Sequence, residues 1–200
     1  YFHLGNKETM QSLRYNSFDY QKHIGSVIEF YENKFSKISN DDCDSGSNNI
    51  FILGTPRSGT TLIESIISSN NEVRSAGELT SAFKLIETFI NNSENQDHDE
   101  FIQIFRKTYS DRTNFIRGEF KYIVDKLPEN FLYLGIIMKL LPKAKIIRTF
   151  RDPWDVAISL YKQRYVTNIP YSASFFNIGV FMSNFEAINN YWSDHINTKS

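Results

Sequence analysis

The segment Gly54–Thr61, Gly-Thr-Pro-Arg-Ser-Gly-Thr-Thr, has the composition of an anion-binding loop. It follows a short apolar run and precedes residues with helical spacing, so successive backbone N–H groups and a helix start can converge on one anion. Its glycines match the G-x-x-x-x-G of the Walker A loop, but Thr60 stands where that motif has its lysine, which disfavours ATP hydrolysis. Arg57 adds a permanent fork of donors that suits sulfate or phosphate. The flanking elements favour an anion site over the alternative, a surface turn with a solvated arginine.

A second group of polar residues lies between Arg151 and Ser159, where an arginine at a strand end is followed by a serine two turns into the next helix. At a rise of about 1.5 Å per residue, Ser159 lies roughly 10 Å along the axis from Asp152, on the same side. Arg151 and Ser159 can therefore hold one phosphate between them. The alternative is equally open: Arg151 pairs with a cap acid, and Ser159 is a buried helix hydroxyl.

Taken together, these two elements resemble the sulfotransferase family that uses 3′-phosphoadenosine 5′-phosphosulfate (PAPS). The resemblance covers about residues 49–192 and is closest to the bacterial sulfotransferases linked to tetratricopeptide repeats, which are similar to protein-tyrosine sulfotransferases. Arg151 with Ser159 looks like the family's 3′-phosphate site. The residues that look like its 5′-phosphosulfate loop are Pro56, Arg57, Ser58, Gly59, Thr60 and Thr61.

The resemblance also implies catalytic roles. Glu78, in Ala-Gly-Glu-Leu, takes the position of the general base, and Lys126, in Asp-Lys-Leu-Pro, takes a position near the bridging oxygen. Lys126 and Arg57 would stabilise charge on the leaving phosphate and the sulfuryl oxygens. PAPS is then the donor, no metal is needed, and the acceptor is a hydroxyl, with peptide tyrosine or a saccharide as examples, or an amine. Without the resemblance, Glu78 is more simply a surface acid and Lys126 a helix-start lysine.

The elements that must position these residues alternate between strands and helices, which predicts an α/β fold. We expect a P-loop-like parallel sheet flanked by helices, the sulfotransferase fold, with the ligand site at the carboxyl ends of the strands. Apolar runs predict strands at 50–53, 122–124 and 144–150. Helical spacing predicts helices at 19–38, around 62–67, from Thr80 to Phe89, at 127–141, from Asp152 and around 181–192.

Local signals mark several of the helix boundaries. Thr80 is expected to cap its helix, and Asp152-Pro153 has an acid at the cap and proline at the first helical position. The polar stretch from Asn91 to Glu100 is expected to be a solvated separator. Trp154 and the phenylalanines are expected in the core.

Composition excludes several classes of protein. The chain has 200 residues, a formal charge of −1 and 40% hydrophobic residues, which supports one folded domain and argues against a general nucleic-acid binder. One cysteine, Cys43, rules out an internal disulfide and a cysteine-based zinc site, and suits a reducing compartment, so we expect a cytoplasmic location. No apolar run reaches the roughly 20 residues of a membrane span. His3, His23, His98 and His195 lack ligand spacing. The oligomeric state is not indicated.

The chain divides into three parts. We expect a helical segment at 1–38 that ends a repeat region, a polar linker at 39–48, and a partial sulfotransferase domain at 49–200. The domain is expected to be incomplete at its C-terminal end, because full domains of the family continue beyond a helix like the one ending near Trp192.

Two rival functions stay open at this point. One is a P-loop nucleotide kinase or NTPase, which the missing Walker lysine disfavours. The other is a non-catalytic interaction module that keeps the loop without its chemistry.

Overall fold

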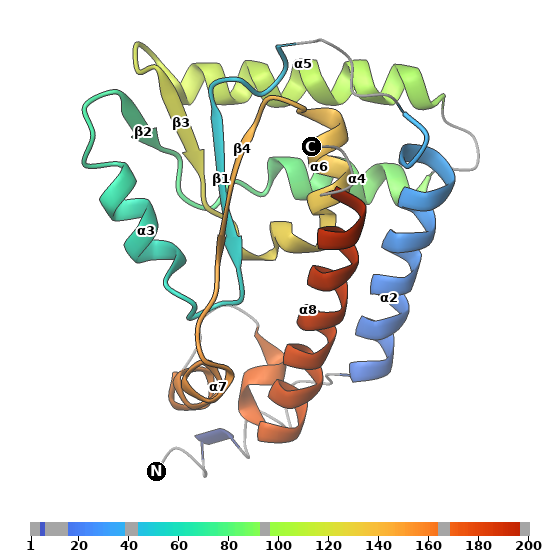
Figure 1. Cartoon of the computed structure of the whole chain (residues 1–200), viewed down its shortest axis with the longest axis vertical. Helices are drawn as coiled ribbons and strands as arrows, with labels where there is room; N and C mark the ends of the chain where they lie inside the picture. Colours follow the sequence, from blue (N-terminus) through green and yellow to red (C-terminus); the bar gives the residue numbers. More distant parts are fainter. Residues whose placement is uncertain (1–4, 7–15, 39–43, 93–96, 164–168, 197–200) are drawn as a thin grey trace.

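Four parallel strands form the centre of the computed structural model (Figure 1). Their order across the sheet is β2–β3–β1–β4, and their bounds are β1 Asn49–Gly54, β2 Val73–Ser75, β3 Tyr122–Asp125 and β4 Lys145–Thr149. The structure describes residues 5–6, 16–38, 44–92, 97–163 and 169–196. The α/β fold with a parallel sheet flanked by helices is confirmed. Strand β2 was not predicted, because it is short and has only one apolar residue, Val73.

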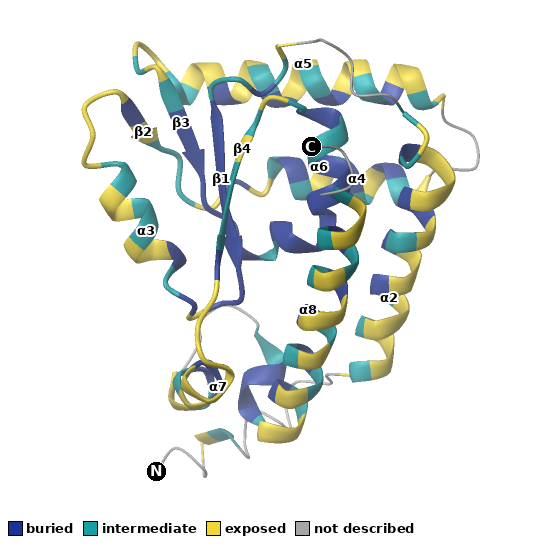
Figure 2. Ribbon diagram, in the orientation of Figure 1, coloured by how far each residue is buried: buried dark blue, intermediate teal, exposed yellow. Residues whose placement is uncertain are grey.

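Strand β1 is buried on both faces (Figure 2). Its side chains alternate between two cores, as the period of a strand requires. Phe51 and Leu53 belong to the larger core, whereas Ile50 and Ile52 pack with Val73 and Val124 on the opposite face. The continuous apolar run in the sequence therefore has the origin expected for a central parallel strand.

Helix α3, Thr60–Ile67, covers the face of the smaller core. Ile63 and Ile67 pack against it, but Leu62 and Ile66 are 64% and 58% exposed. The helix predicted from these four residues is confirmed, although only half of them contact the sheet.

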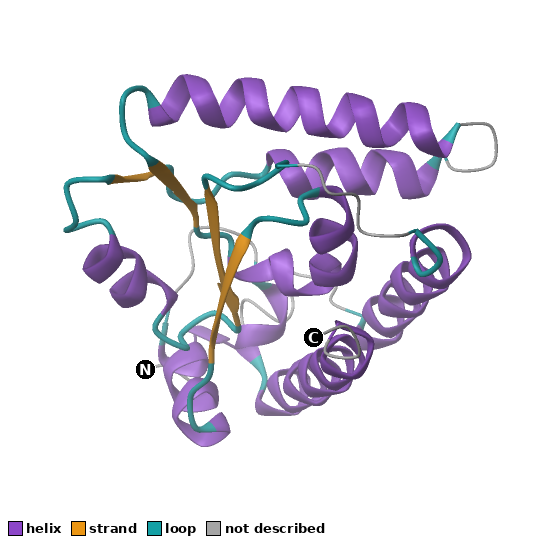
Figure 3. Cartoon of the chain, turned by 45° about the horizontal axis from the view of Figure 1, so that its top comes forward, coloured by secondary structure: helices purple, strands orange, loops and turns teal. Residues whose placement is uncertain are grey.

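The other face carries most of the helices (Figure 3). These elements are α2 Ser17–Phe30 with the π-turn η1 Tyr31–Phe35, α4 Ser81–Asn91, α5 His98–Arg117, the 3₁₀ turn η2 Pro128–Tyr133, α6 Leu134–Leu140, α7 Pro153–Lys162, the 3₁₀ turn η3 Pro170–Ala173 and α8 Phe175–Ile196. The helix predicted over 127–141 thus begins as a 3₁₀ turn. The strand predicted at 144–150 is confirmed as β4, and the helix before it ends within one residue of the predicted end at 141.

The N-terminal helix is part of the same core as the sheet. Ile24, Val27 and Phe35 belong to the cluster that holds Phe51 and Trp192. The helix predicted over 19–38 is confirmed in its position, but regular α-helix ends at Phe30. Residues 39–43 of the expected linker lie outside the described residues. Residues 44–48 form a turn, and the Ser45 carbonyl in it accepts from the N–H of Lys143, just after α6, at 3.1 Å.

The last helix is locked to α6 by Trp192. The indole N–H donates to the Phe131 carbonyl at 2.9 Å, and the ring lies against Gly135, where an added Cβ would meet Trp192 Cε3 at 2.6 Å. The prediction of a helix whose buried residues are Phe181, Phe185, Ile188 and Trp192 is confirmed.

Three local expectations are wrong. Thr80 occupies the cap position of α4, but its backbone is not extended and its side chain makes no capping bond. Trp154 is 76% exposed, because α7 buries Val156, Ala157 and Leu160 on its opposite face; some phenylalanines are also exposed, with Phe115 at 89%. Of the expected separator 91–100, residues 93–96 lie outside the described residues, whereas Asn91 belongs to α4 and α5 already starts at His98, capped by Asp97.

Candidate active site

The loop Gly54–Thr61 leaves the carboxyl end of β1 and enters α3. Three of its residues have a positive φ: Gly54 at 155°, Arg57 at 72° and Gly59 at 98°. Ser58 holds the loop against β4, because its hydroxyl donates to the Thr55 carbonyl at 2.6 Å and lies 2.6 Å from Thr149 Oγ1. The strand, turn and helix predicted around this loop are all present.

The start of α3 is uncapped. Its N-cap is Gly59, which has no side chain to accept a bond, and the first turn contains no acid. Among the described residues, the N–H groups of Gly59, Thr60 and Thr61 have no acceptor, and the first bond of this turn runs from the Ile63 N–H to the Gly59 carbonyl at 3.0 Å. These free donors and the helix dipole favour an anion at this place.

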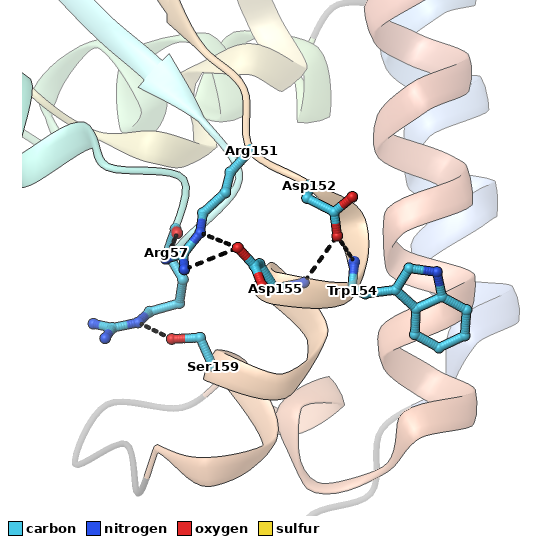
Figure 4. Close-up of polar contacts among 6 residues, drawn as sticks. All are labelled: Arg57, Arg151, Asp152, Trp154, Asp155 and Ser159. Carbon is cyan, nitrogen blue, oxygen red and sulfur yellow. Dashed lines mark hydrogen bonds and ion pairs between the residues drawn. The ribbon is translucent and has the colours of Figure 1, made fainter.

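Helix α7 is capped by contrast. Asp152 accepts from the N–H groups of Trp154 at 2.9 Å and Asp155 at 3.2 Å, with Pro153 at the first helical position (Figure 4). The predicted cap is confirmed. Because its own carboxylate occupies these amides, α7 can contribute to an anion site through its side chains rather than through its N-terminus.

The two predicted phosphate sites meet at Arg57 (Figure 4). Its Nε donates to Ser159 Oγ at 2.9 Å, and its carbonyl accepts from Arg151 Nη1 at 3.4 Å. Arg151 also pairs with Asp155, at 3.3 Å between Nη2 and Oδ2, in a salt bridge that is about half exposed. Arg151 and Ser159 are thus brought to one edge of the loop. Arg151 pairs with Asp155, an acid in the first turn of α7, and Ser159 is partly buried and bonded to Arg57.

Glu78 and Lys126 form an ion pair at the carboxyl ends of β2 and β3. Lys126 Nζ lies 2.5 Å from Glu78 Oε1, and the lysine side chain is 8% exposed whereas the glutamate is 57% exposed. The turn that carries Glu78 is fixed to β3 by the Lys126 N–H, which donates to the Gly77 carbonyl at 2.9 Å. Gly77 has φ +65°, a conformation that favours glycine.

A second carboxylate, Glu64 of α3, reaches the same lysine. Glu64 Oε2 lies 3.8 Å from Lys126 Nζ, and its side chain is 12% exposed. The Ser75 hydroxyl donates to Glu64 Oε1 at 2.5 Å and accepts from the Gly77 N–H at 3.1 Å. Neither Glu64 nor Ser75 was predicted as a site residue. The sequence did contain a signal for Glu64, because this acid lies beside Ile63 and Ile67, on the helix face that meets the sheet.

A buried acid lies next to Lys126 at the end of β3. Asp125 is 1% exposed and accepts from the Tyr109 hydroxyl at 2.7 Å. Burial raises the pKa of Asp125 to about 7, against the lowering effect of the Tyr109 bond, and burial also raises the pKa of Tyr109 well above its ordinary value. Asp125 is thus a buried carboxyl whose pKa also responds to the nearby charges of Glu64 and Lys126.

A cavity of about 410 Å³ opens between the loop and the turn after β3. Pro56, Arg57, Thr60, Thr61 and Glu78 line it, together with Thr80, Phe83, Leu127, Pro128, Glu129 and Ile169. Five of the predicted site residues therefore share one cavity. Lys126 is outside this lining and pairs with Glu78, and the buried Ser58 contacts Thr149 of β4.

The three histidines that the structure describes are not among the residues that line this cavity. His23 Nε2 is 3.1 Å from the Tyr133 hydroxyl, His98 is 3.8 Å from Asp99, and His195 contacts the Tyr191 carbonyl. His3 lies outside the described residues. In the part of the chain that the structure describes, no group of three metal-ligating side chains comes together, and no helix has the length and apolar character needed to cross a membrane.

Comparison with known proteins relates the chain to one family. A family model described as "Sulfotransferase family" matches residues 49–197. An uncharacterized protein of Aquifex aeolicus (strain VF5) is 35% identical over 159 residues, which covers 72% of this chain and 21% of the relative. The chain therefore spans about a fifth of the length of that relative.

Proposed function

This chain belongs to the sulfotransferase family, and we propose that it transfers a sulfuryl group from PAPS to an acceptor hydroxyl. One observation carries the proposal: the uncapped start of α3 and Arg57 open into the same cavity as the candidate base, Glu78. An anionic donor and a group that removes a proton are thereby placed together. The match of the family model to residues 49–197 supports the same reaction class.

The loop is proposed to hold the 5′-phosphosulfate. Its free N–H groups at Gly59, Thr60 and Thr61 are donors without acceptors in the described structure. The guanidinium of Arg57 adds charge-assisted bonds, each worth about 1.5–3 kcal/mol. A sulfate or phosphate group fits this donor set because every polar group facing it can donate.

Arg151 and Ser159 are proposed to hold the 3′-phosphate. Both are available with small rearrangements: Arg151 is 46% exposed and pairs with an exposed acid, Asp155, and Ser159 is bonded to Arg57. A phosphate would replace Asp155 as the partner of Arg151. Arg57 would leave Ser159 and turn to the sulfuryl group, which links occupation of the two sites.

Glu78 is proposed as the general base. It takes the proton of the acceptor hydroxyl as the acceptor oxygen bonds to sulfur and the bond between sulfur and the 5′-phosphate oxygen breaks. The products are a sulfate ester, adenosine 3′,5′-bisphosphate and a protonated Glu78, so atoms and charge balance. Lys126 and Arg57 stabilise the charge that develops on the leaving phosphate and the sulfuryl oxygens.

The Glu78–Lys126 contact must open for both residues to act. Glu64 makes this opening less costly, because it keeps a carboxylate 3.8 Å from the buried ammonium when Glu78 turns to the acceptor. A buried lysine left without any carboxylate would be strongly unfavourable. Glu64 is thus proposed as the resident counter-ion of Lys126.

We also propose a link to tetratricopeptide repeats, a similarity to tyrosine sulfotransferases and a cytoplasmic location. The chain is proposed to divide into a helical segment at 1–38, a linker at 39–48 and a sulfotransferase domain at 49–200. The family match, which begins at residue 49, supports the start of the third part.

The test is transfer of radiolabelled sulfuryl from PAPS onto pooled phenols, saccharides and amines. The wild type should label at least one pool, and Glu78→Gln should not. A fully folded wild-type protein that neither labels a pool nor binds adenosine 3′,5′-bisphosphate would overturn the proposal.

A further inference from the structure

The residues that line the cavity fall into two halves of unlike chemistry. The first half comes from the loop and consists of Pro56, Arg57, Thr60 and Thr61, which the proposed function assigns to the donor. The second half is mostly apolar and contains Phe83, Leu127, Pro128 and Ile169, with Thr80 and Glu129 as its polar members beside Glu78. Because the loop residues are assigned to the donor, the second half is where an acceptor would present its hydroxyl to Glu78.

The charges of the second half have one sign. Arg57 belongs to the loop, and the nearly buried Lys126 is not part of the lining. The charged groups in the rest of the described lining are therefore the carboxylates of Glu78 and Glu129. Among the described residues, Glu129 forms no salt bridge and no hydrogen bond with another side chain. A negatively charged acceptor would meet two carboxylates and the phosphates of the donor.

The environment of Glu129 makes its ionisation unfavourable, because the raising effects on its pKa outweigh the lowering ones. Burial raises the pKa of Glu129, and the nearby negative charge of Glu78 raises it further, against the lowering effects of its own N–H and of Lys126. A cation beside Glu129 would relieve this unfavourable ionisation. An aromatic wall, Phe83, stands in the same half and favours a flat apolar body.

Resting on the proposed function, we infer that the acceptor is a hydroxyl compound with an aromatic or aliphatic body and an ammonium group, whose charge pairs with Glu129 while its hydroxyl faces Glu78. Acidic peptides and anionic saccharides are disfavoured as acceptors for the same reason. Glu129 is then a specificity-determining residue of the acceptor half.

The test compares three para-substituted phenols of similar size that differ in charge. Tyramine carries an ammonium, 4-propylphenol is neutral, and 3-(4-hydroxyphenyl)propionate carries a carboxylate. Their binding is measured by calorimetry with and without adenosine 3′,5′-bisphosphate, in the wild type, in Glu129→Gln and in Glu119→Gln. Glu119 is an exposed acid before β3, outside the cavity lining, and serves as the matched control.

The wild type should bind tyramine at least about tenfold more tightly than the propionate, as one charge-assisted contact provides. Glu129→Gln should bring this ratio to within about threefold, and Glu119→Gln should leave it unchanged. Three results would overturn the inference: equal binding of tyramine and the propionate, an affinity ratio of these two phenols that is unchanged in Glu129→Gln, or no binding of any phenol. Failure of the proposed function can be distinguished from failure of this inference. It would appear as absent binding of adenosine 3′,5′-bisphosphate and absent sulfuryl transfer, independently of how the phenols bind.

Discussion

The ammonium of Lys126 lies 2.5 Å from the carboxylate of Glu78 and 3.8 Å from that of Glu64. One nearly buried cation thus joins the turn that carries the candidate base to the helix that follows the anion loop. Ser75 closes the same network, because its hydroxyl contacts both Glu64 and the N–H of Gly77. The arrangement thus links α3, the edge strand β2 and the end of β3 through one cation.

Removing the carboxylate of Glu78 should separate catalysis from binding. In Glu78→Gln, turnover should fall by about 10²–10⁴-fold, the usual contribution of a general base. Affinity for adenosine 3′,5′-bisphosphate should change by less than about threefold, because the proposed donor contacts lie on the loop and α7. Steady-state transfer and calorimetry check this, with the exposed Glu72→Gln as control. Retained turnover in Glu78→Gln would remove this residue from the base role.

The shared lysine makes the two glutamates interdependent in stability. Glu78→Gln alone should cost less than about 1 kcal/mol in the free energy of unfolding, because that carboxylate is 57% exposed and screened by water. Glu64→Gln alone should cost about 1 kcal/mol. The double variant leaves Lys126 without either partner and should cost about 1–3 kcal/mol more than the sum.

Urea unfolding of the four proteins in this cycle measures the coupling, independently of activity. The same cycle in a Lys126→Met background should be additive, because the buried charge is gone. Additivity in the native background would mean that Glu64 does not act as a partner of Lys126.

The 3′-phosphate assignment predicts nucleotide selectivity. Arg151→Ala should weaken binding of adenosine 3′,5′-bisphosphate by at least about tenfold and binding of AMP by much less, since only the former has a 3′-phosphate. Asp155→Asn should leave or improve the bisphosphate affinity, because Asp155 competes for Arg151 at 3.3 Å. Calorimetric titrations check both variants. Equal losses for the two nucleotides in Arg151→Ala would count against the assignment.

The buried Asp125 predicts a pH dependence of stability. Its pKa in the folded protein is about 7, above the ordinary value of 3.8, so the folded state holds a proton that the unfolded state has lost between about pH 4 and 7. Stability therefore falls as pH rises through this window, by up to about 4 kcal/mol from this group.

Asp125→Asn should remove this slope, since the amide stays uncharged and its oxygen can still accept from Tyr109. The variant should be more stable than the wild type at pH 8, with a smaller difference at pH 5. Thermal unfolding at several pH values measures this. An unchanged slope in the variant would show that Asp125 is ionised in the folded protein at neutral pH.

The sequence predicted those structural elements whose conformation depends mainly on neighbouring residues. The apolar run of β1, the glycine-containing loop and the Asp152 cap are each specified by neighbouring residues, and each is present. The exposure of Trp154 was not predictable from its type, because it depends on which face of α7 meets the core.

The contacts of the site arise between distant segments. Glu64, Ser75 and Lys126 come together from α3, β2 and the end of β3. Glu129 lines the same cavity as Glu78, and no spacing in the sequence marks it. The family resemblance supplied Glu78 and Lys126, whereas only the structure shows that they form an ion pair.

Nucleotide binding by the unmodified protein tests the central claim most directly. Calorimetric titrations should be run with adenosine 3′,5′-bisphosphate, AMP and ATP, each with and without Mg²⁺. The account predicts that the bisphosphate binds without Mg²⁺ at least about tenfold more tightly than AMP, and that ATP with Mg²⁺ binds no more tightly than AMP. Preferential, Mg²⁺-dependent binding of ATP, or no distinction among the three nucleotides, would contradict it.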